Sequence, residues 1–136
     1  MKLNLKALKM FADLMRTPAP DPKDPKRIYK ILKRDPSKTA ESEFLRFVSM
    51  LLQDNANDAI PHLHNILKLP KSELKMFATE GAQPDGSTHY DSINYIQICT
   101  AIIRDLKREN LSASRRVNKK IHHVLRIYCW KHNIIL

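Results

Sequence analysis

Apolar residues recur every three or four positions along most of the chain, and this spacing predicts amphipathic helices. The clearest example is residues 37–53, where five apolar side chains share one helix face: Phe44, Phe47, Val48, Leu51 and Leu52. Helices are also predicted at residues 3–16, 26–34, 57–67, 72–78, 92–108 and 112–133. We expect the core to form around 37–53, 92–108 and 112–133, which carry extensive apolar faces.

The scarcity of glycine supports an all-helical fold. The 136 residues include two glycines, Gly81 and Gly86, and both lie in one short loop. Tight hairpins need residues that accept positive φ at regular intervals, so this scarcity argues against a β-sandwich. The β-branched residues of 92–108 would also suit a strand, but the length of the segment favours a helix. The sequence therefore predicts a single compact all-α domain of six to seven helices.

Four prolines within residues 17–25 predict a semi-rigid linker after the first helix. We therefore divide the chain into an N-terminal amphipathic helix (1–16), the Pro-rich linker (17–25) and a helical core domain (26–136). The core domain ends in a basic C-terminal helix.

Several polar residues are expected to mark where helices begin. Asp24 and Pro25 have the residue types of an N-cap and a first-turn proline for the helix after the linker. Ser72 is expected to cap the short helix that follows it. Asp91 is expected to cap the long helix that starts at residue 92.

The net charge of +10 is unevenly distributed along the chain. Residues 1–40 hold 11 Lys/Arg against 4 Asp, and residues 102–136 hold 9 Lys/Arg against 2 acidic residues. Residues 41–101 hold 4 Lys/Arg against 8 acidic residues. If the two basic ends pack side by side, they form a cationic face that would attract an anionic partner. The alternative is that the charge serves only solubility.

The C-terminal helix combines cations with the single tryptophan, Trp130. Such a helix can hold a phosphate backbone and stack on a base, which favours a non-catalytic protein that binds RNA or single-stranded DNA. The alternative is that Trp130 packs against a neighbouring helix. The predicted nucleic-acid-binding residues are Lys26, Arg27, Lys30, Lys33, Arg34, Arg115, Arg116, Lys119, Lys120, His123, Trp130 and Lys131.

A second function class is a protein-interaction adaptor or a subunit of a larger assembly. The apolar arc of residues 3–15 is wide enough that a protein partner or a second copy of the chain would cover it. The acidic middle of the chain offers another docking surface. No apolar run approaches the ~20 residues that span a bilayer, so we expect no membrane span and a location in the cytoplasm or nucleus.

Arg116 and His122, separated by five residues, resemble the Arg–(four to six residues)–His pattern of the HEPN ribonucleases. Those are helical proteins that act as RNases, usually with the motif paired across a dimer. The resemblance implies a metal-independent ribonuclease as a third function. It covers these two residues, and Val117 stands where the family usually has a polar residue. The sequence leaves enzymatic activity open and assigns no catalytic residue.

Cys99 and Cys129 lie among apolar residues, as is typical of reduced, buried thiols, with a disulfide between two helices as the alternative. His122, Cys129 and His132 lie near one helix face and could begin a zinc site. No Cys-x2-Cys pair elsewhere supplies the remaining ligands, so we expect neither a metal site nor a cofactor. Residues 81–88 have the glycine spacing of a phosphate loop but lack its lysine, and are interpreted as a turn.

Overall fold

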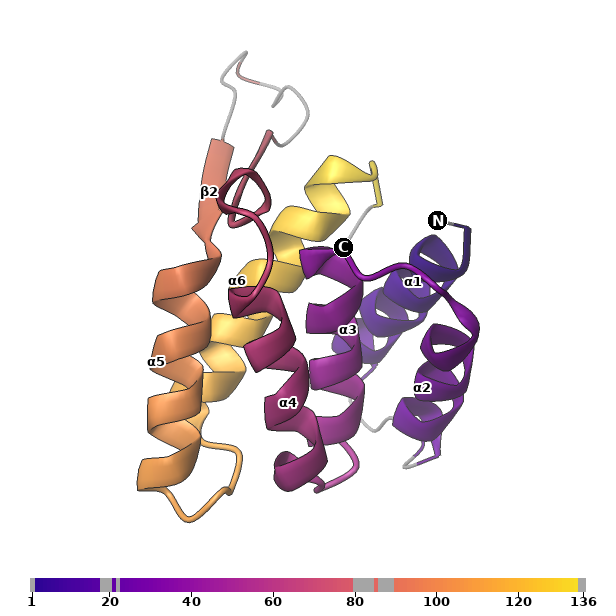
Figure 1. Cartoon of the computed structure of the whole chain (residues 1–136). Coiled ribbons are helices and arrows are strands. Elements are labelled where there is room, and N and C mark those ends of the chain that lie inside the picture. Colours follow the sequence, from indigo (N-terminus) through magenta and orange to yellow (C-terminus); the bar gives the residue numbers. More distant parts are fainter. Residues whose placement is uncertain (1, 18–20, 22, 80–84, 86–89, 135–136) are drawn as a thin grey trace.

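The computed structural model describes residues 2–17, 21, 23–79, 85 and 90–134 (Figure 1). The described chain forms six α-helices, one 3₁₀ turn at Lys71–Glu73 and one β-hairpin, so the all-α prediction is confirmed with the hairpin as an addition. The elements are α1 (Lys2–Arg16), α2 (Asp24–Arg34), α3 (Ala40–Leu51), α4 (Ala56–Leu67), β1 (Lys75–Thr79), β2 (Tyr90–Asn94), α5 (Tyr95–Arg108) and α6 (Arg115–Lys131).

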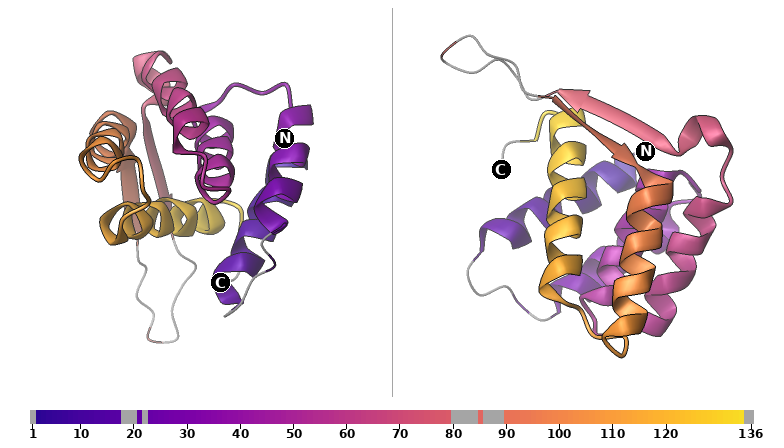
Figure 2. Two further views of the ribbon diagram at one scale, coloured as in Figure 1. Left: turned by 90° about the horizontal axis from the view of Figure 1, so that it is seen from below. Right: turned by 90° about the vertical axis from the view of Figure 1, so that its left-hand side faces the viewer.

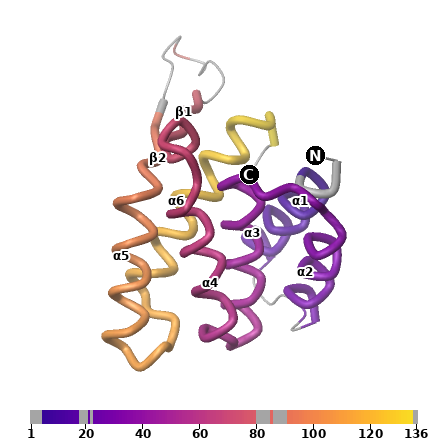
Figure 3. The backbone as a smooth tube through the Cα atoms, viewed as in Figure 1, coloured from indigo at the N-terminus to yellow at the C-terminus, as the bar shows by residue number. Residues whose placement is uncertain are grey.

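Helix α3 lies at the centre of the fold, with α4 on one side and α1 and α2 on the other (Figures 1 and 2). Nearly all of its side chains are buried, including Phe44, Phe47 and the charged pair Glu43 and Arg46. Helix α5 packs beside α4, and α6 runs across the back of the bundle in contact with α1, α5 and the hairpin. The backbone trace shows α5 continuing directly from β2, with the hairpin at one end of the bundle (Figure 3).

The apolar arc of α1 is buried within the fold. Ala7, Leu8, Phe11 and Ala12 are at most 1% exposed, and α1 packs on α2, α3 and α6. The arc that the sequence analysis offered as a partner-binding face is therefore largely part of the protein's own core.

The predicted helix from Ser72 to Ala78 is wrong. Lys71–Glu73 forms only a 3₁₀ turn, and β1 then pairs antiparallel with β2, from Lys75 opposite Asn94 to Thr79 opposite Tyr90. Five residues are too few to separate a period of 2 from a period of 3.6. The long-range pairing with β2 supplies the backbone hydrogen bonds that decide between them.

The helix predicted at 92–108 begins later, because its first residues belong to β2. Asn94 caps α5 by accepting a hydrogen bond from the Gln97 amide at 3.3 Å. Asp91, the predicted cap, lies inside β2, where it accepts a hydrogen bond from the Ser92 amide. The first three residues of the segment thus belong to a strand, and the remainder, which holds most of its β-branched residues, forms the helix.

Two further helix starts differ from prediction by a few residues. Helix α3 begins at Ala40, because the Thr39 side chain accepts the Ser42 amide and caps the helix there. Helix α2 includes Asp24 as its first residue, with no side-chain cap, and Pro25 lies in its first turn as expected. Instead of capping the helix, the Asp24 carboxylate accepts a hydrogen bond from Arg27 at 2.9 Å.

Candidate nucleic-acid interface

Helix α6 carries the densest group of cations in the C-terminal part of the chain. Its 17 residues include no Asp or Glu. The Ser114 side chain caps it by accepting the Val117 amide at 3.1 Å. One side is buried against the core, and the residues on that side are Val117, Ile121, Val124, Leu125, Ile127, Tyr128 and Cys129. The amphipathic C-terminal helix is therefore present, between residues 115 and 131.

The opposite side of α6 forms a continuous row of polar and aromatic side chains. We call this row the α6 strip: Arg115, Lys119, His122, Arg126 and Trp130. The four polar members are exposed and repeat at intervals of three or four residues, so they lie above one another on the helix. At 1.5 Å per residue, the strip is about 23 Å long.

Trp130 is neither fully exposed for base stacking nor fully buried against a neighbouring helix. Its ring is half-buried and packs against the hydrophobic core. The Arg126 guanidinium lies 5.3 Å from the ring centroid, within the range of a cation–π contact. Arg126 was missed by the sequence analysis because it lies between the buried Leu125 and Ile127. Its spacing of four from Trp130 and seven from Lys119 was the available signal.

Several predicted binding residues of α6 contact carboxylates within the protein. Lys131 bonds Glu41 of α3 at 3.1 Å, and His123 lies 3.7 Å from Asp91 of β2. Asp91 also lies 3.8 Å from Arg126, so one carboxylate borders the α6 strip. These contacts hold α6 against its neighbours and reduce the charge available to a ligand.

Lys120 is likewise committed to a structural contact. Its ammonium bonds the carboxylate of Asp105, which is 3% exposed, at 3.1 Å. This hydrogen bond lowers the pKa of Asp105 below its usual value and outweighs burial, which acts in the opposite direction. Lys120 therefore joins α6 to α5.

Arg115, Arg116 and Lys119 differ from these residues. All three are exposed, and in the described part of the chain none has a carboxylate within 4 Å. They make the N-terminal half of α6 the part with uncompensated positive charge.

The predicted cations of α2 form a second row on its outer face: Lys26, Arg27, Lys30, Lys33 and Arg34. All are exposed, and Arg27 pairs with Asp24 and, at 3.7 Å, with Asp21. Helix α1 lies between α2 and α6 (Figure 2). The two rows therefore do not run side by side. One residue of each row, Lys26 of α2 and His122 of α6, lines the same pocket.

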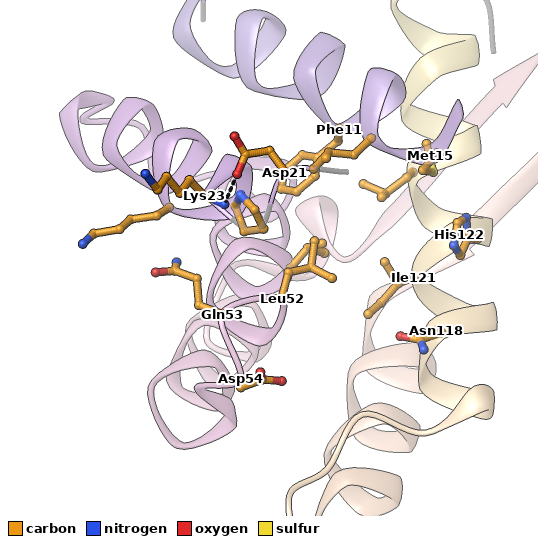
Figure 4. Close-up of a pocket in the computed structure, with 15 residues that line it drawn as sticks. Phe11, Met15, Asp21, Lys23, Leu52, Gln53, Asp54, Asn118, Ile121 and His122 are labelled. Carbon is orange, nitrogen blue, oxygen red and sulfur yellow. Dashed lines mark hydrogen bonds between the residues drawn. The ribbon is translucent and has the colours of Figure 1, made fainter. Parts of the chain in front are cut away.

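This pocket has a volume of about 550 Å³ and lies between the end of α1, the start of α2, the end of α3 and α6 (Figure 4). Lys26 lines it from α2, and Asn118 and His122 line it from α6. Asp54 adopts a left-handed backbone conformation with φ 57°, which Asp tolerates, and this turn places Gln53 and Asp54 at the pocket.

The buried interior contains a second chemical cluster that involves α6. The hydroxyls of Tyr95 and Tyr128 share a hydrogen bond of 2.6 Å, and burial raises the pKa of both well above the usual value. Cys99 and Cys129 are free and buried, as expected. Burial raises the pKa of the Cys99 thiol to about 12 and that of Cys129 to about 11. Both thiols are therefore protonated and poor nucleophiles at neutral pH.

The zinc-site residues considered from the sequence have different surroundings. His122 lines the pocket, Cys129 is buried, and His132 bonds Glu41 at 2.6 Å. No group of three or more His, Cys, Asp or Glu with the geometry of a metal site occurs among the described residues.

The Arg–His pair of α6 does not lie on one face of the helix. Arg116 and His122, with five residues between them, occupy positions i and i+6 of α6, so their side chains leave the helix about 120° apart around its axis. Residues 81–88, interpreted as a turn, lie outside the described residues except for Asp85. In the described chain, no helix has both the length and the apolar character needed to cross a membrane.

The fold and surface define a small helical-bundle protein with an acid-free basic helix on one side. Comparison with protein-family models, with curated proteins and with solved structures gave no significant match.

Proposed function

We propose that this protein binds the phosphate backbone of single-stranded RNA or DNA along the α6 strip, without catalysis. The observation that carries the proposal is the uncompensated charge of Arg115, Arg116 and Lys119 on a helix that has no acidic residue. Cations that neutralise phosphates release counterions, and this release is the main source of sequence-independent affinity. The buried, reduced thiols accord with a cytoplasmic or nuclear protein.

The position of the arginines within α6 adds support. Arg115 and Arg116 occupy the first turn, next to the positive end of the helix dipole. Cations there cost about 0.3–1 kcal/mol each, whereas anions are stabilised. A phosphate at this end would interact favourably with both the side chains and the dipole.

The aromatic end of the strip favours a single strand over a duplex. Trp130 keeps part of its ring at the surface beside Arg126. Unpaired bases can stack on such a ring, for ~1–3 kcal/mol per base, while the bases of a duplex are already stacked on one another. The α2 row offers a second place for phosphates, on the far side of α1.

The test is a titration of labelled single- and double-stranded RNA and DNA at several salt concentrations. The decisive variant is Arg115→Ala/Arg116→Ala/Lys119→Ala, which removes the three uncompensated cations. Its matched control is Lys68→Ala/Lys71→Ala/Lys75→Ala, which removes the same charge from exposed positions near the hairpin. A second triple variant, Lys30→Ala/Lys33→Ala/Arg34→Ala, measures the contribution of α2.

We expect the α6 variant to bind at least tenfold more weakly and to flatten the plot of log K against log[salt] by about 2, because each lost contact with a single strand contributes ~0.7. Trp130 emission should change on binding to the unmodified protein. Equal losses of affinity in the α6 variant and the hairpin control would show that binding depends on net charge alone and not on the α6 strip. No binding by the unmodified protein at low salt would reject the proposal.

A further inference from the structure

The pocket and the α6 strip share one residue, His122, which makes the pocket continuous with the proposed backbone path. Asn118, one helical turn earlier, lines the same pocket (Figure 4). Both side chains are exposed, and neither has a hydrogen-bond partner among the described residues. The pocket thus presents unused polar groups directly beside the strip.

The inner wall of the pocket is apolar. Leu14 and Met15 of α1, Leu52 after α3, and Ile121 and Leu125 of α6 contribute to it. Leu52 keeps 48% of its surface exposed, although it lies beside the buried core. The volume of about 550 Å³ lies within the range of small-molecule sites, which combine apolar walls with a few polar groups. A flat ring system would cover the exposed face of Leu52.

The charges at the mouth discriminate between possible occupants. Lys23 and Lys26 lie on the α2 side, but Asp21 and Asp54 line the same pocket. The two carboxylates offset the two ammonium groups, so the pocket has no net positive charge with which to hold a phosphate or carboxylate. The uncharged base of a nucleotide needs no such charge. The phosphates of the strand would lie at the mouth of the pocket, near Lys26 and the α6 strip.

We infer that the pocket accepts one unpaired base of a bound single strand, an inference that rests on the proposed function. The Asn118 amide both donates and accepts hydrogen bonds, so it can pair with a base edge. The His122 imidazole can stack on the ring. The strand then passes from the α6 strip over the pocket towards Lys26, which links the two basic rows at one point.

The experiment compares a labelled single strand of about eight uridylates with an abasic strand of the same length, which has equal charge and no bases. Leu52→Trp fills the pocket, and Asn118→Ala removes its amide. The matched controls are Ile96→Trp, where Ile96 is 52% exposed on α5, and Asn57→Ala on α4. Circular dichroism and urea unfolding establish that each variant is folded.

We expect the unmodified protein to prefer the strand with bases by about tenfold. Leu52→Trp and Asn118→Ala should reduce this preference without changing affinity for the abasic strand, whereas both controls should retain it. If the pocket variants bind both strands as the unmodified protein does, the base pocket is rejected while the backbone interface stands. If the unmodified protein binds neither strand, the proposed function itself fails.

Discussion

At the scale of single residues, the most constrained group is the buried ion pair of Arg46 and Glu43 in α3, 2.7 Å apart. The Arg46 guanidinium also donates to the carbonyls of Leu32, Asp35 and Ser37, so it satisfies backbone groups where α2 ends. One charged side chain thus joins α3 to the end of α2. Its burial is compatible with its charge because nearly all of its donors have partners.

We predict that Arg46→Ala lowers the free energy of unfolding by about 3–5 kcal/mol, because it leaves the Glu43 carboxylate buried without its cation. Urea unfolding followed by circular dichroism measures the loss. Arg104→Ala is the matched control. Its side chain is 67% exposed and lies 3.6 Å from Asp105, so we expect a cost below about 1 kcal/mol. Similar losses in the two variants would contradict the structural role of Arg46.

The carboxylates of Glu43 and Asp105 should make the protein sensitive to acid. Burial, the largest influence, raises the pKa of Glu43, but hydrogen bonds from His62 and Asn65 and the charge of Arg46 together lower it. Asp105 also has a lowered pKa, through Lys120. Both groups therefore bind protons more readily in the unfolded chain than in the folded protein.

The stability that the Glu43 and Asp105 carboxylates give to the folded protein is therefore complete above their unfolded pKa values of about 4. It is lost as the pH falls through their lower pKa values in the folded protein. Urea unfolding between neutral pH and about pH 2 measures the slope. In Asp105→Asn the slope below about pH 4 should be shallower than in the unmodified protein. An unchanged slope would show that the Asp105 carboxylate does not contribute.

At the scale of elements, short-range and long-range interactions determine different parts of the structure. The helices α3, α4 and α6 follow their apolar periodicity, and side chains before each one cap it. The hairpin does not follow local pattern, since each five-residue strand depends on a partner beyond residues 80–89. Apolar spacing therefore predicts the long periodic helices correctly and fails where pairing between distant residues decides the conformation.

The boundary between β2 and α5 gives a test at this scale. We predict that Asn94→Ala costs about 1 kcal/mol, because the amide of Gln97 loses its side-chain acceptor. Asp91→Ala should cost less, since Asp91 accepts a single local hydrogen bond from the Ser92 amide and its ion pairs with His123 and Arg126, at 3.7 and 3.8 Å, are long and partly exposed. Thermal unfolding of both variants ranks them. A larger loss of stability in Asp91→Ala than in Asn94→Ala would contradict the assignment of Asn94 as the cap of α5.

At the scale of the whole molecule, α1 belongs to the same core as α6, although the Pro-rich linker separates it from α2. Leu8 and Phe11 are buried, and α1 packs on both α2 and α6. This arrangement places α1 beside α6 and keeps the cations of α2 apart from the α6 strip. It also removes the apolar arc as an argument for an adaptor.

We predict that Leu8→Ala destabilises the whole protein by about 2–5 kcal/mol, because it creates a cavity between helices. Trp130 lies in α6, so its fluorescence reports an effect transmitted from α1 to the far part of the fold. Fluorescence and circular dichroism should show one shared transition at a lower urea concentration. Ile96→Ala, at an exposed position, is the control. Separate transitions would indicate that α1 folds independently.

The candidate site could be predicted only in part, and the division has a physical reason. Helical spacing placed Arg115, Lys119 and Trp130 on a basic helix without knowledge of the fold. The fate of each charge depended on its neighbours, since Lys120 and Lys131 bond Asp105 and Glu41 from other helices. Arg126 belongs to the strip because it is exposed on the same side of α6 as Lys119 and His122.

Helix class and charge distribution follow from local sequence, because periodicity and composition act over a few turns of chain. The hairpin, the burial of α1, the separation of the two basic rows and the pocket between Leu52 and Asn118 come from packing between residues far apart in sequence. Those contacts depend on side-chain shape and on the relative position of whole helices. Neither can be obtained from the spacing of apolar residues along one segment.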